Sequence, residues 1–319
     1  MTLRAGEKQA RRRNGTMSSD PQVPIYYINL QGRPDRRERM ERVLSQRGLR
    51  AERIEAHTPA TLPPDCRTAF EQADRISRLE DAEMACLASH RAAMQAIIAS
   101  GAPAGVVLED DVRIARDFGR VIGILAARAD FDIVRLETYQ ERYRMAEPAQ
   151  PLGDGFTVYG MAEFDGGAGG YMVTREGAER YLAQGIDPTV PADDWLFNMH
   201  CAKPRRLRAC QLVPAVVIQF WHRSPDGPMT MDTDLQRARD RRYERQGTVF
   251  RDAARPLLVR EVRRAYIRLR NAGLRLRHGN PVFYRCVKPH VGFADDLPGQ
   301  SAADADGPVA AAGDVPPTL

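Results

Sequence analysis

The stretch AGVVLEDD, Ala104 to Asp111, decides the fold of this 319-residue chain. Its first five residues are typical of a buried strand, and the carboxylates Glu109, Asp110 and Asp111 follow without a break. Alternation along an extended chain would place Glu109 and Asp111 on one face and Asp110 on the other. We expect these acids at the edge where open α/β sheets bind ligands, outside the carboxyl ends of their strands.

Strands and helices alternate on both sides of this stretch. Apolar runs predict further strands at 24–30, 53–56, 131–136, 171–174 and 211–219. Apolar residues at helical spacing predict helices at 35–48, 83–100, 118–129 and 175–184, with loops at 59–65 and 188–194. The alternation favours an α/β fold, with a mostly parallel, Rossmann-like sheet flanked by helices on both faces.

Crowded carboxylates repel one another unless a cation compensates their charge. Oxygen ligands suit Mg²⁺ or Mn²⁺, so Glu109, Asp110 and Asp111 are candidate metal ligands, with His222 as a further candidate. Such an ion would neutralise charge on a departing diphosphate. The alternative interpretation is an acidic turn with a helix cap, because an acidic string is a weak signal by itself.

Candidate phosphate-binding residues follow the first expected strand. They are Asn29, Leu30, Arg33, Arg36 and Arg37. Arginine makes forked contacts with phosphate oxygens. The alternative is a solvated helix start, at which Asp35, Arg36, Arg37 and Glu38 pair with one another.

Two other elements carry polar candidates. On the helix 83–100, Glu83 lies almost two turns before His90 and can share a face with it, and Ser89 precedes His90. A lone helical histidine is more often structural than a ligand. Arg135, Glu137 and Thr138 leave the strand 131–136 at its carboxyl end and could orient ligands or contact hydroxyl groups. A buried ion pair that supports the sheet is the alternative for these three.

Two loops complete the candidate site. Gly166, Gly167, Gly169 and Gly170 permit positive φ and close backbone approach, which favours a backbone wall against a bound molecule. Asp193 and Asp194 are candidates for a base that takes a hydroxyl proton, with Asp193 preferred. The alternative role for either aspartate is a helix N-cap.

Seven motifs occur in one order and together resemble glycosyltransferase family 25, the lipooligosaccharide galactosyltransferases. They are 28–30 with Arg33 and 35–37, 83–86 with 89–90, 108–112, 134–138, 167–171, 191–193, and 214–215 with Gln219. The resemblance covers roughly residues 25–225. It implies a GT-A type fold, a divalent metal at the acidic triplet, inversion at the transferred anomeric carbon, and Asp193 as the base. Ala82 and Ala85 stand where some members carry glycine.

By the same resemblance, UDP-galactose is the expected donor, and a lipooligosaccharide, lipopolysaccharide or other surface glycan is the expected acceptor. Two rival functions stay open. Clustered carboxylates at strand ends also serve metal-dependent phosphoryl-transfer enzymes and hydrolases. A non-catalytic protein that binds nucleotide sugars would keep the fold without the base.

The cysteines and the hydropathy bear on the compartment. Cys66, Cys86, Cys201, Cys210 and Cys286 show no C-x-x-C spacing, which favours free thiols over a disulfide framework or a zinc site. No apolar run is long enough to span a membrane, and residues 1–20 lack the apolar core of a secretory signal. We therefore expect a cytoplasmic protein.

Charge is unevenly distributed along the chain, with basic segments at 1–20 and 251–293 and an acidic segment at 294–319. We expect a disordered basic segment at 1–20, a catalytic domain at 21–250, a basic amphipathic helical segment at 251–293 and a disordered acidic tail at 294–319. Leucines and arginines at 257–277 could dock on an anionic membrane surface, or the apolar stripe could pack on the catalytic domain. This distribution disfavours nucleic acid as a partner.

Overall fold

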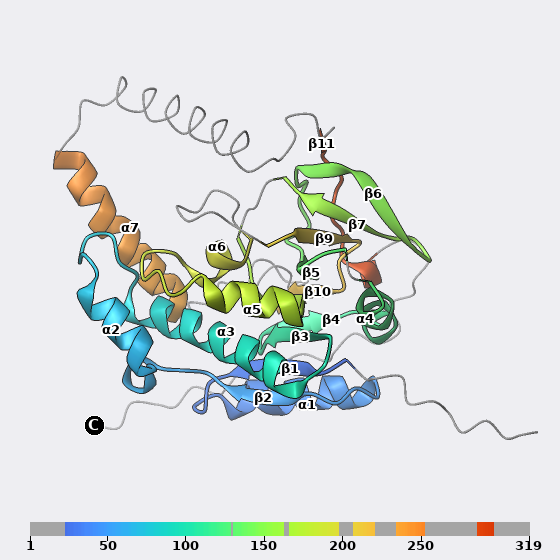
Figure 1. Ribbon diagram of the computed structural model, residues 1–319, viewed down its shortest axis with the longest axis horizontal. Helices are drawn as coiled ribbons and strands as arrows, with labels where there is room; N and C mark the ends of the chain where they lie inside the picture. The colour runs from blue at the N-terminus through green and yellow to red at the C-terminus, as the bar shows by residue number, and fades with distance from the viewer. Residues whose placement is uncertain are drawn as a thin grey trace, which may run out of the picture.

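The computed structural model describes residues 23–128, 130–162, 166–197, 207–220, 234–252 and 286–296. The strands are β1 (Ile25–Asn29), β2 (Glu52–Glu55), β3 (Ala104–Glu109), β4 (Val112–Ile114), β5 (Ile133–Arg135), β6 (Met145–Gly153), β7 (Phe156–Met161), β8 (Gly170–Thr174), β9 (Ala209–Val213), β10 (Val217–Gln219) and β11 (Cys286–Val287). Nine of them form one sheet in the order β11-β6-β7-β9-β5-β8-β3-β1-β2, and β10 and β4 form a two-stranded sheet (Figure 1).

The helices lie around this sheet. They are α1 (Pro34–Gln46), α2 (Pro64–Gln72), α3 (Asp81–Ser100), α4 (Phe118–Ala126), α5 (Arg175–Ala183), α6 (Ala192–Phe197) and α7 (Asp234–Asp252), with short 3-10 turns at Pro59–Thr61 and Ala294–Asp296. Local sequence explains two of their ends. Pro34 occupies the first turn of α1, where its missing N–H costs nothing, and Gly101 ends α3 at a φ of +72°.

The expected α/β, Rossmann-like class is confirmed, and the sheet is mixed. Strand β1 pairs in parallel with β2 and β3, and β5 pairs in parallel with β9. Strand β8 lies between β3 and β5 and runs antiparallel to both. The amino end of β8 therefore lies beside the carboxyl ends of β3 and β5, which brings the glycine-rich loop to the acidic edge.

The sheet separates two apolar cores because alternate side chains point to opposite faces. Ile25 and Tyr27 of β1 pack with α1 and α4 in one core. Tyr26 and Ile28 pack with α2, α3, α5 and α6 in the other. Figure 1 shows α3 and α5 side by side across one face of the sheet. Two covered faces hold the carboxyl edge of β1 and β3 in a fixed position.

Several elements differ from the sequence-based expectation. The single strand expected at 211–219 is two strands, β9 and β10, which belong to different sheets. Helix α6 begins inside the expected loop 188–194. The hairpin of β6 and β7 was not predicted, because Pro148 and Pro151 interrupt β6 and its burial does not alternate regularly.

The boundary of the folded domain is corrected at its C-terminal side. Strand β11 pairs with β6, and Val291, Phe293 and Ala294 are buried. The Asp295 carboxylate accepts a hydrogen bond from the backbone N–H of Arg116 at 3.1 Å. Residues 286–296 thus pack on the folded domain, although the sequence placed them in a helical segment and a disordered tail.

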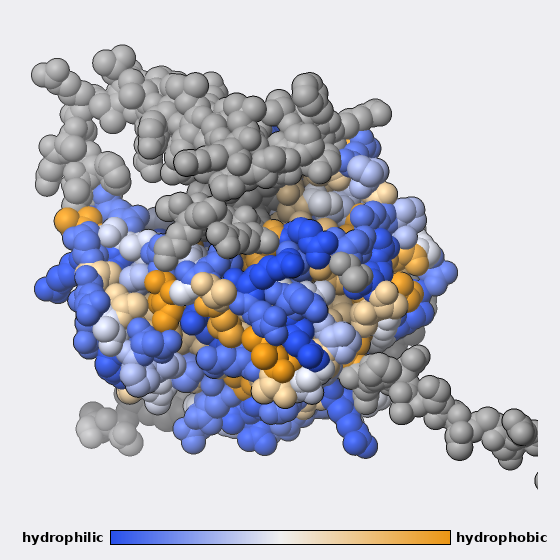
Figure 2. All heavy atoms as spheres, in the orientation of Figure 1, coloured by the Kyte–Doolittle hydropathy of each residue, from blue (hydrophilic) through white to orange (hydrophobic). Residues whose placement is uncertain are grey.

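Several segments and residues singled out in the sequence lie outside the described part of the chain. The segments 1–20, 257–277 and 297–319, together with Cys201 and His222, lie outside the residues that the structure describes. Within the described part, no helix is long and apolar enough to cross a membrane. On the face shown in Figure 2, the described surface is mainly hydrophilic, with apolar residues in small groups between hydrophilic ones.

Candidate active site

The acidic triplet lies in a turn. Strand β3 ends at Glu109, and Asp110 and Asp111 form the turn that leads into β4. The expectation that Asp110 points away from Asp111 is wrong, because the extended backbone stops before them. Both carboxylates contact the same guanidinium: Arg36 Nη1 lies 2.9 Å from Asp110 Oδ1 and 3.4 Å from Asp111 Oδ2.

Asp110 is held in place by the protein. The buried Asn29 at the end of β1 donates from Nδ2 to Asp110 Oδ2 at 2.7 Å and to the carbonyl oxygen of Arg33 at 3.1 Å. Its Oδ1 accepts from Arg53 Nε at 3.0 Å. Since Arg36 contacts the other Asp110 oxygen, both oxygens of this carboxylate are already engaged.

Glu109 and Asp111 share one neutral partner, the side chain of Gln219. Gln219 Nε2 donates to Glu109 Oε2 at 2.8 Å and is 3.4 Å from Asp111 Oδ1. Burial, followed by the negative charge of Glu109, raises the pKa of Asp111 to about 7, although Arg36 opposes this shift. The described cations therefore compensate only part of the charge, and the oxygen-rich pair fits a hard divalent ion.

The remaining residues after β1 divide into two groups. Arg36 contacts the triplet, whereas Arg33 pairs with Asp35 at 2.6 Å and Arg37 pairs with Glu41 at 2.9 Å on the exposed surface of α1. Leu30 has 42% of its surface exposed at the same edge. The solvated-helix alternative therefore describes the contacts of Arg33 and Arg37, and Arg36 is the arginine brought to the acids.

Ser89 and His90 are both buried on α3. The Ser89 hydroxyl donates to the Ala85 carbonyl oxygen at 2.8 Å and accepts from the His57 N–H at 2.8 Å, so it fixes the loop after β2. His90 Nδ1 lies 2.9 Å from the Tyr171 hydroxyl, and its Nε2 lies 3.4 Å from Glu109 Oε1. His90 therefore faces the acidic edge, whereas Ser89 supports a neighbouring loop.

Arg135 at the end of β5 and the residues that follow it are buried beneath the glycine-rich loop. The Arg135 guanidinium stacks over the Tyr139 and Tyr143 rings at 5.0 and 5.4 Å from their centroids. Glu137 Oε2 accepts the Gly169 N–H at 2.8 Å, and burial raises the pKa of Glu137 to about 8. Thr138 instead donates its hydroxyl to the Val291 carbonyl oxygen, so it anchors the C-terminal segment.

Close packing accounts for the glycine-rich loop. A Cβ at Gly167, which has a φ of +90°, would lie 2.3 Å from the Tyr139 hydroxyl and 2.7 Å from Glu137 Oε2. A Cβ at Gly169 would lie 3.0 Å from both Gln219 Cγ and Glu137 Oε1. A Cβ at Gly170 would lie 2.7 Å from Val217. The missing side chains let the loop sit directly on the floor of the site.

Asp193 and Asp194 lie in the first turn of α6. Asp193 is buried, and its Oδ2 accepts from the Gly167 N–H at 3.3 Å and from Arg239 Nη2 at 3.1 Å. Its Oδ1 accepts from the Asp194 N–H at 3.0 Å. Asp193 therefore joins the glycine-rich loop to α7, and it faces the same buried region as Tyr139 and Glu137.

Sequence reasoning assigned no site role to three residues near this edge, although two of them, Cys86 and Tyr171, lie in the motifs that carry the family resemblance. Cys86 lies one helical turn before His90, and that four-residue spacing was a usable signal. Tyr171 in β8 supports His90 from a distant part of the chain. Arg239 reaches Asp193 from α7, a charged helix in which no local pattern distinguishes one arginine from the next.

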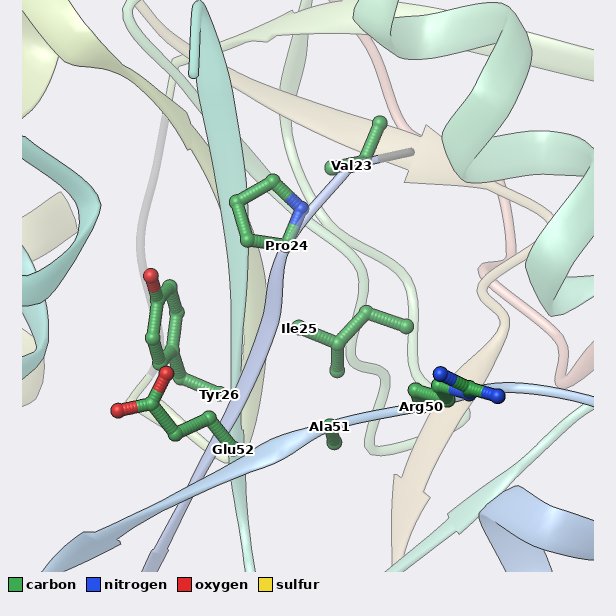
Figure 3. A pocket seen from close by; sticks show the side chains of 7 residues that line it. All are labelled: Val23, Pro24, Ile25, Tyr26, Arg50, Ala51 and Glu52. Atoms are coloured by element: carbon green, nitrogen blue, oxygen red, sulfur yellow. The ribbon is translucent and has the colours of Figure 1, made fainter. Parts of the chain in front are cut away.

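A hollow of about 310 Å³ lies elsewhere, at the amino ends of β1 and β2 (Figure 3). Its lining comes from 23–26 and 50–52. Because β1 and β2 run parallel, this hollow is at the opposite end of the strands from Glu109 and Asp111. It is therefore separate from the candidate active site.

Fold and site together define a class: a Rossmann-like, GT-A type α/β domain whose carboxyl edge carries carboxylates flanked by arginine. Residues 22–196 match the family described as "Glycosyltransferase family 25 (LPS biosynthesis protein)". The chain belongs to glycosyltransferase family 25, a family of sugar-transferring enzymes, and the resemblance found in the sequence is confirmed.

Curated relatives agree with this family at low identity. The chain is 25% identical over 239 residues to a Drosophila melanogaster protein called "Glycosyltransferase 25 family member", with 66% of this chain and 38% of the relative covered. It is 24% identical over 263 residues to "Procollagen galactosyltransferase 1-A" of Xenopus laevis, with 70% and 42% covered. The chain thus spans about two fifths of the length of these relatives.

Proposed function

We propose that the chain transfers galactose from UDP-galactose, with inversion, to a lipooligosaccharide, lipopolysaccharide or other surface glycan. Family membership supports sugar transfer, and the family description names lipopolysaccharide biosynthesis. The name of the Xenopus laevis relative supports galactose as the sugar. The choice of UDP-galactose as the sugar donor rests on these two descriptions.

One observation carries this proposal: Glu109 and Asp111 crowd at the carboxyl edge with incomplete compensation of their charge. The raised pKa of Asp111, about 7, reflects burial and the neighbouring Glu109. A divalent cation would remove this repulsion. The placement of the pair outside the ends of parallel strands matches the usual ligand position in α/β sheets.

Glu109 and Asp111 are the residues that would hold Mn²⁺ or Mg²⁺. Asp110 instead fixes the turn, because Asn29 and Arg36 engage both of its oxygens. When bound, such an ion neutralises the charge that develops on a departing diphosphate. Arg36 adds a second positive charge beside the same acids.

Asp193 is the proposed base for the acceptor hydroxyl. Hydrogen bonds from Gly167 and Asp194 orient its carboxylate, and Arg239 holds it from α7. A base must lie within hydrogen-bond reach of the proton that it takes. Asp194, half-buried in the same turn, stays the second candidate.

The site of action follows from the proposed acceptor. A lipid-linked acceptor would place the enzyme in the cytoplasm, peripheral on the inner face of the cytoplasmic membrane. The segment 257–277 would supply the contact with anionic lipid, because apolar residues recur in its sequence at helical spacing and arginines fill many of the positions between them.

The first experiment measures UDP release from UDP-galactose, with and without Mn²⁺, so that no acceptor need be known. Wild type is compared with Asp111→Asn and with Glu52→Gln, which removes an exposed carboxylate at the opposite end of the strands. We expect Mn²⁺-dependent release that Asp111→Asn lowers by roughly a hundredfold and Glu52→Gln leaves unchanged. Metal-independent release, or equal rates in all three proteins, would overturn the proposal.

A further inference from the structure

Cys86, His90 and Glu109 form a cluster next to the proposed hard-ion pair. One ligand atom from each, the Cys86 thiol sulfur, a His90 ring nitrogen and a Glu109 carboxylate oxygen, lies within 4.8 Å of the other two. Cys86 and His90 are four residues apart on α3, so they share one face of the helix. Glu109 reaches them from the end of β3.

His90 is oriented as metal-binding histidines usually are. Its Nδ1 lies 2.9 Å from the Tyr171 hydroxyl, and its Nε2 faces Glu109 Oε1 at 3.4 Å. When Nδ1 carries the proton and donates it to the Tyr171 oxygen, the lone pair of Nε2 points toward Glu109. A supporting hydrogen bond of this kind fixes the tautomer and the ring orientation of a ligand histidine.

The site is partly open to solvent. The His90 side chain is 1% exposed, whereas that of Glu109 is 24% exposed and Cys86 is half-buried. The Cys86 thiol is free of any disulfide. Glu109, the most exposed of the three ligands, is therefore accessible from solvent, and the inner ligand His90 is already held in place.

The metal-ligand atoms of this cluster differ in kind from those of the Glu109–Asp111 pair. Magnesium and manganese prefer oxygen ligands, whereas a thiolate with an imidazole selects Zn²⁺ among the common divalent ions. Three protein ligands with one position left open are typical of accessible zinc sites. We propose that Cys86, His90 and Glu109 bind Zn²⁺ at a site adjacent to, and sharing Glu109 with, the Glu109–Asp111 pair.

Binding has a defined proton balance. Cys86 coordinates as the thiolate, so its proton passes to the buffer when Zn²⁺ enters. Glu109 binds through a carboxylate oxygen and His90 through the Nε2 lone pair, so neither needs to release a further proton when Glu109 is ionised and His90 neutral.

Zinc should also inhibit sugar transfer. Glu109 cannot serve the Zn²⁺ and a hard ion with the same geometry, so occupancy of the cluster withdraws one ligand from the hard-ion pair. This consequence rests on the proposed function, whereas Zn²⁺ binding itself does not.

The test uses the full chain, stripped of metal and titrated with Co²⁺, which gives a near-ultraviolet absorption band when a thiolate binds it. We expect the band in wild type and in Cys66→Ala, and its loss in Cys86→Ala. Cys66 is the matched control because its thiol is buried in the apolar core. Zn²⁺ should displace the Co²⁺, and Cys86→Ala should weaken Zn²⁺ binding by more than the roughly tenfold to hundredfold loss typical of removing an outer-shell partner, because Cys86 is a direct ligand.

A second measurement needs no variant. Zn²⁺ should protect Cys86 of wild type from alkylation by iodoacetamide, as read by mass spectrometry of its peptide, while the half-buried Cys286 keeps its rate. A cobalt band that persists in Cys86→Ala, or alkylation of Cys86 that Zn²⁺ does not slow, would overturn the proposed site.

These measurements distinguish a failure of the zinc site from a failure of the proposed sugar transfer. If wild type releases no UDP under any condition, the cobalt band and the alkylation result still decide the zinc site. If release occurs, Zn²⁺ should lower the Mn²⁺-supported rate in wild type, and Cys86→Ala should bring the ratio of the rates with and without Zn²⁺ closer to one. Equal inhibition of both proteins would show that zinc inhibits elsewhere.

Discussion

Arg239 of α7 donates from Nη2 to Oδ2 of Asp193 in α6, at 3.1 Å. The carboxylate is buried and also accepts the Gly167 N–H, so one ion pair joins the proposed base, the glycine-rich loop and a helix beyond the matched family region. Two further arginines of α7 reach the start of α3: Arg242 pairs with Glu83 at 3.0 Å, and Arg245 pairs with Glu80.

The Arg239 pair should matter for turnover more than for donor binding. Arg239→Ala removes the cation that holds Asp193, so we expect kcat to fall by roughly tenfold to a hundredfold with little change in the KM for the donor. Arg239→Lys keeps the charge and should recover part of the rate. Steady-state kinetics checks this, with the exposed Arg241→Ala as control; equal kcat in Arg239→Ala and Arg241→Ala would contradict the role.

The buried pair of Arg242 with Glu83 should matter for stability. Arg242→Ala leaves Glu83, whose side chain is 2% exposed, without its cation, and we expect a loss of about 3–5 kcal/mol in the free energy of unfolding. Arg241 pairs with Glu80 at 3.6 Å on the surface, so Arg241→Ala should cost less than about 1 kcal/mol. Urea denaturation of both variants measures the difference, and similar midpoints would show that the buried pair contributes little.

Stability should fall with rising pH because of Glu137. Its folded pKa is raised to about 8, above the ordinary value of 4.5, so the folded state keeps a proton that the unfolded state has lost between these two values. In this window one such group lowers the free energy of unfolding by about 1.4 kcal/mol per pH unit, and the loss is complete above pH 8.

Glu137→Gln tests this pH dependence, because glutamine keeps an acceptor for the Gly169 N–H. Thermal melting is measured at several pH values between 5 and 8, because the folded pKa of Glu137 is about 8. The melting temperature should decline less steeply with rising pH in the variant than in wild type. Parallel curves for the two proteins would assign the pH dependence to other groups.

The glycine-rich loop should not tolerate a methyl group. Gly167→Ala combines a φ of +90° with contacts as short as 2.3 Å to Tyr139, whereas Gly155→Ala has a similar φ of +82° and open space around it. We expect Gly155→Ala to cost about 1–2 kcal/mol and Gly167→Ala to cost about 1–3 kcal/mol more. Chemical denaturation compares them, and equal losses would mean that the loop moves to accommodate the methyl group.

Arg36 and Arg37 should behave differently although they are neighbours in the sequence. Arg36 contacts Asp110 and Asp111, whereas Arg37 pairs with Glu41 on the exposed face of α1. We expect Arg36→Ala to weaken the binding of UDP about tenfold or more and Arg37→Ala to change it less than about twofold. Calorimetric titration with UDP measures both affinities, and matching values would remove Arg36 from the donor site.

The local pattern of the chain predicted most elements that position the site. Strand β3, the helices α1 and α3 and the glycine that ends α3 follow from apolar spacing and terminal residues. Strand β6 and helix α7 were missed for physical reasons. Prolines interrupt β6, and α7 has so few apolar residues that tertiary ion pairs, rather than an apolar face, hold it to α3.

By itself, the sequence determined that three carboxylates end a buried strand of an α/β fold, because periodicity and residue type are local properties. Only the tertiary structure decided their partners. The turn at Asp110 and Asp111 brings both to Arg36, the antiparallel β8 brings the glycine-rich loop and Tyr171 to the same edge, and α7 brings Arg239 to Asp193. Each of these contacts joins residues far apart in the chain, and packing of the sheet and helices, rather than local spacing, sets which of them meet.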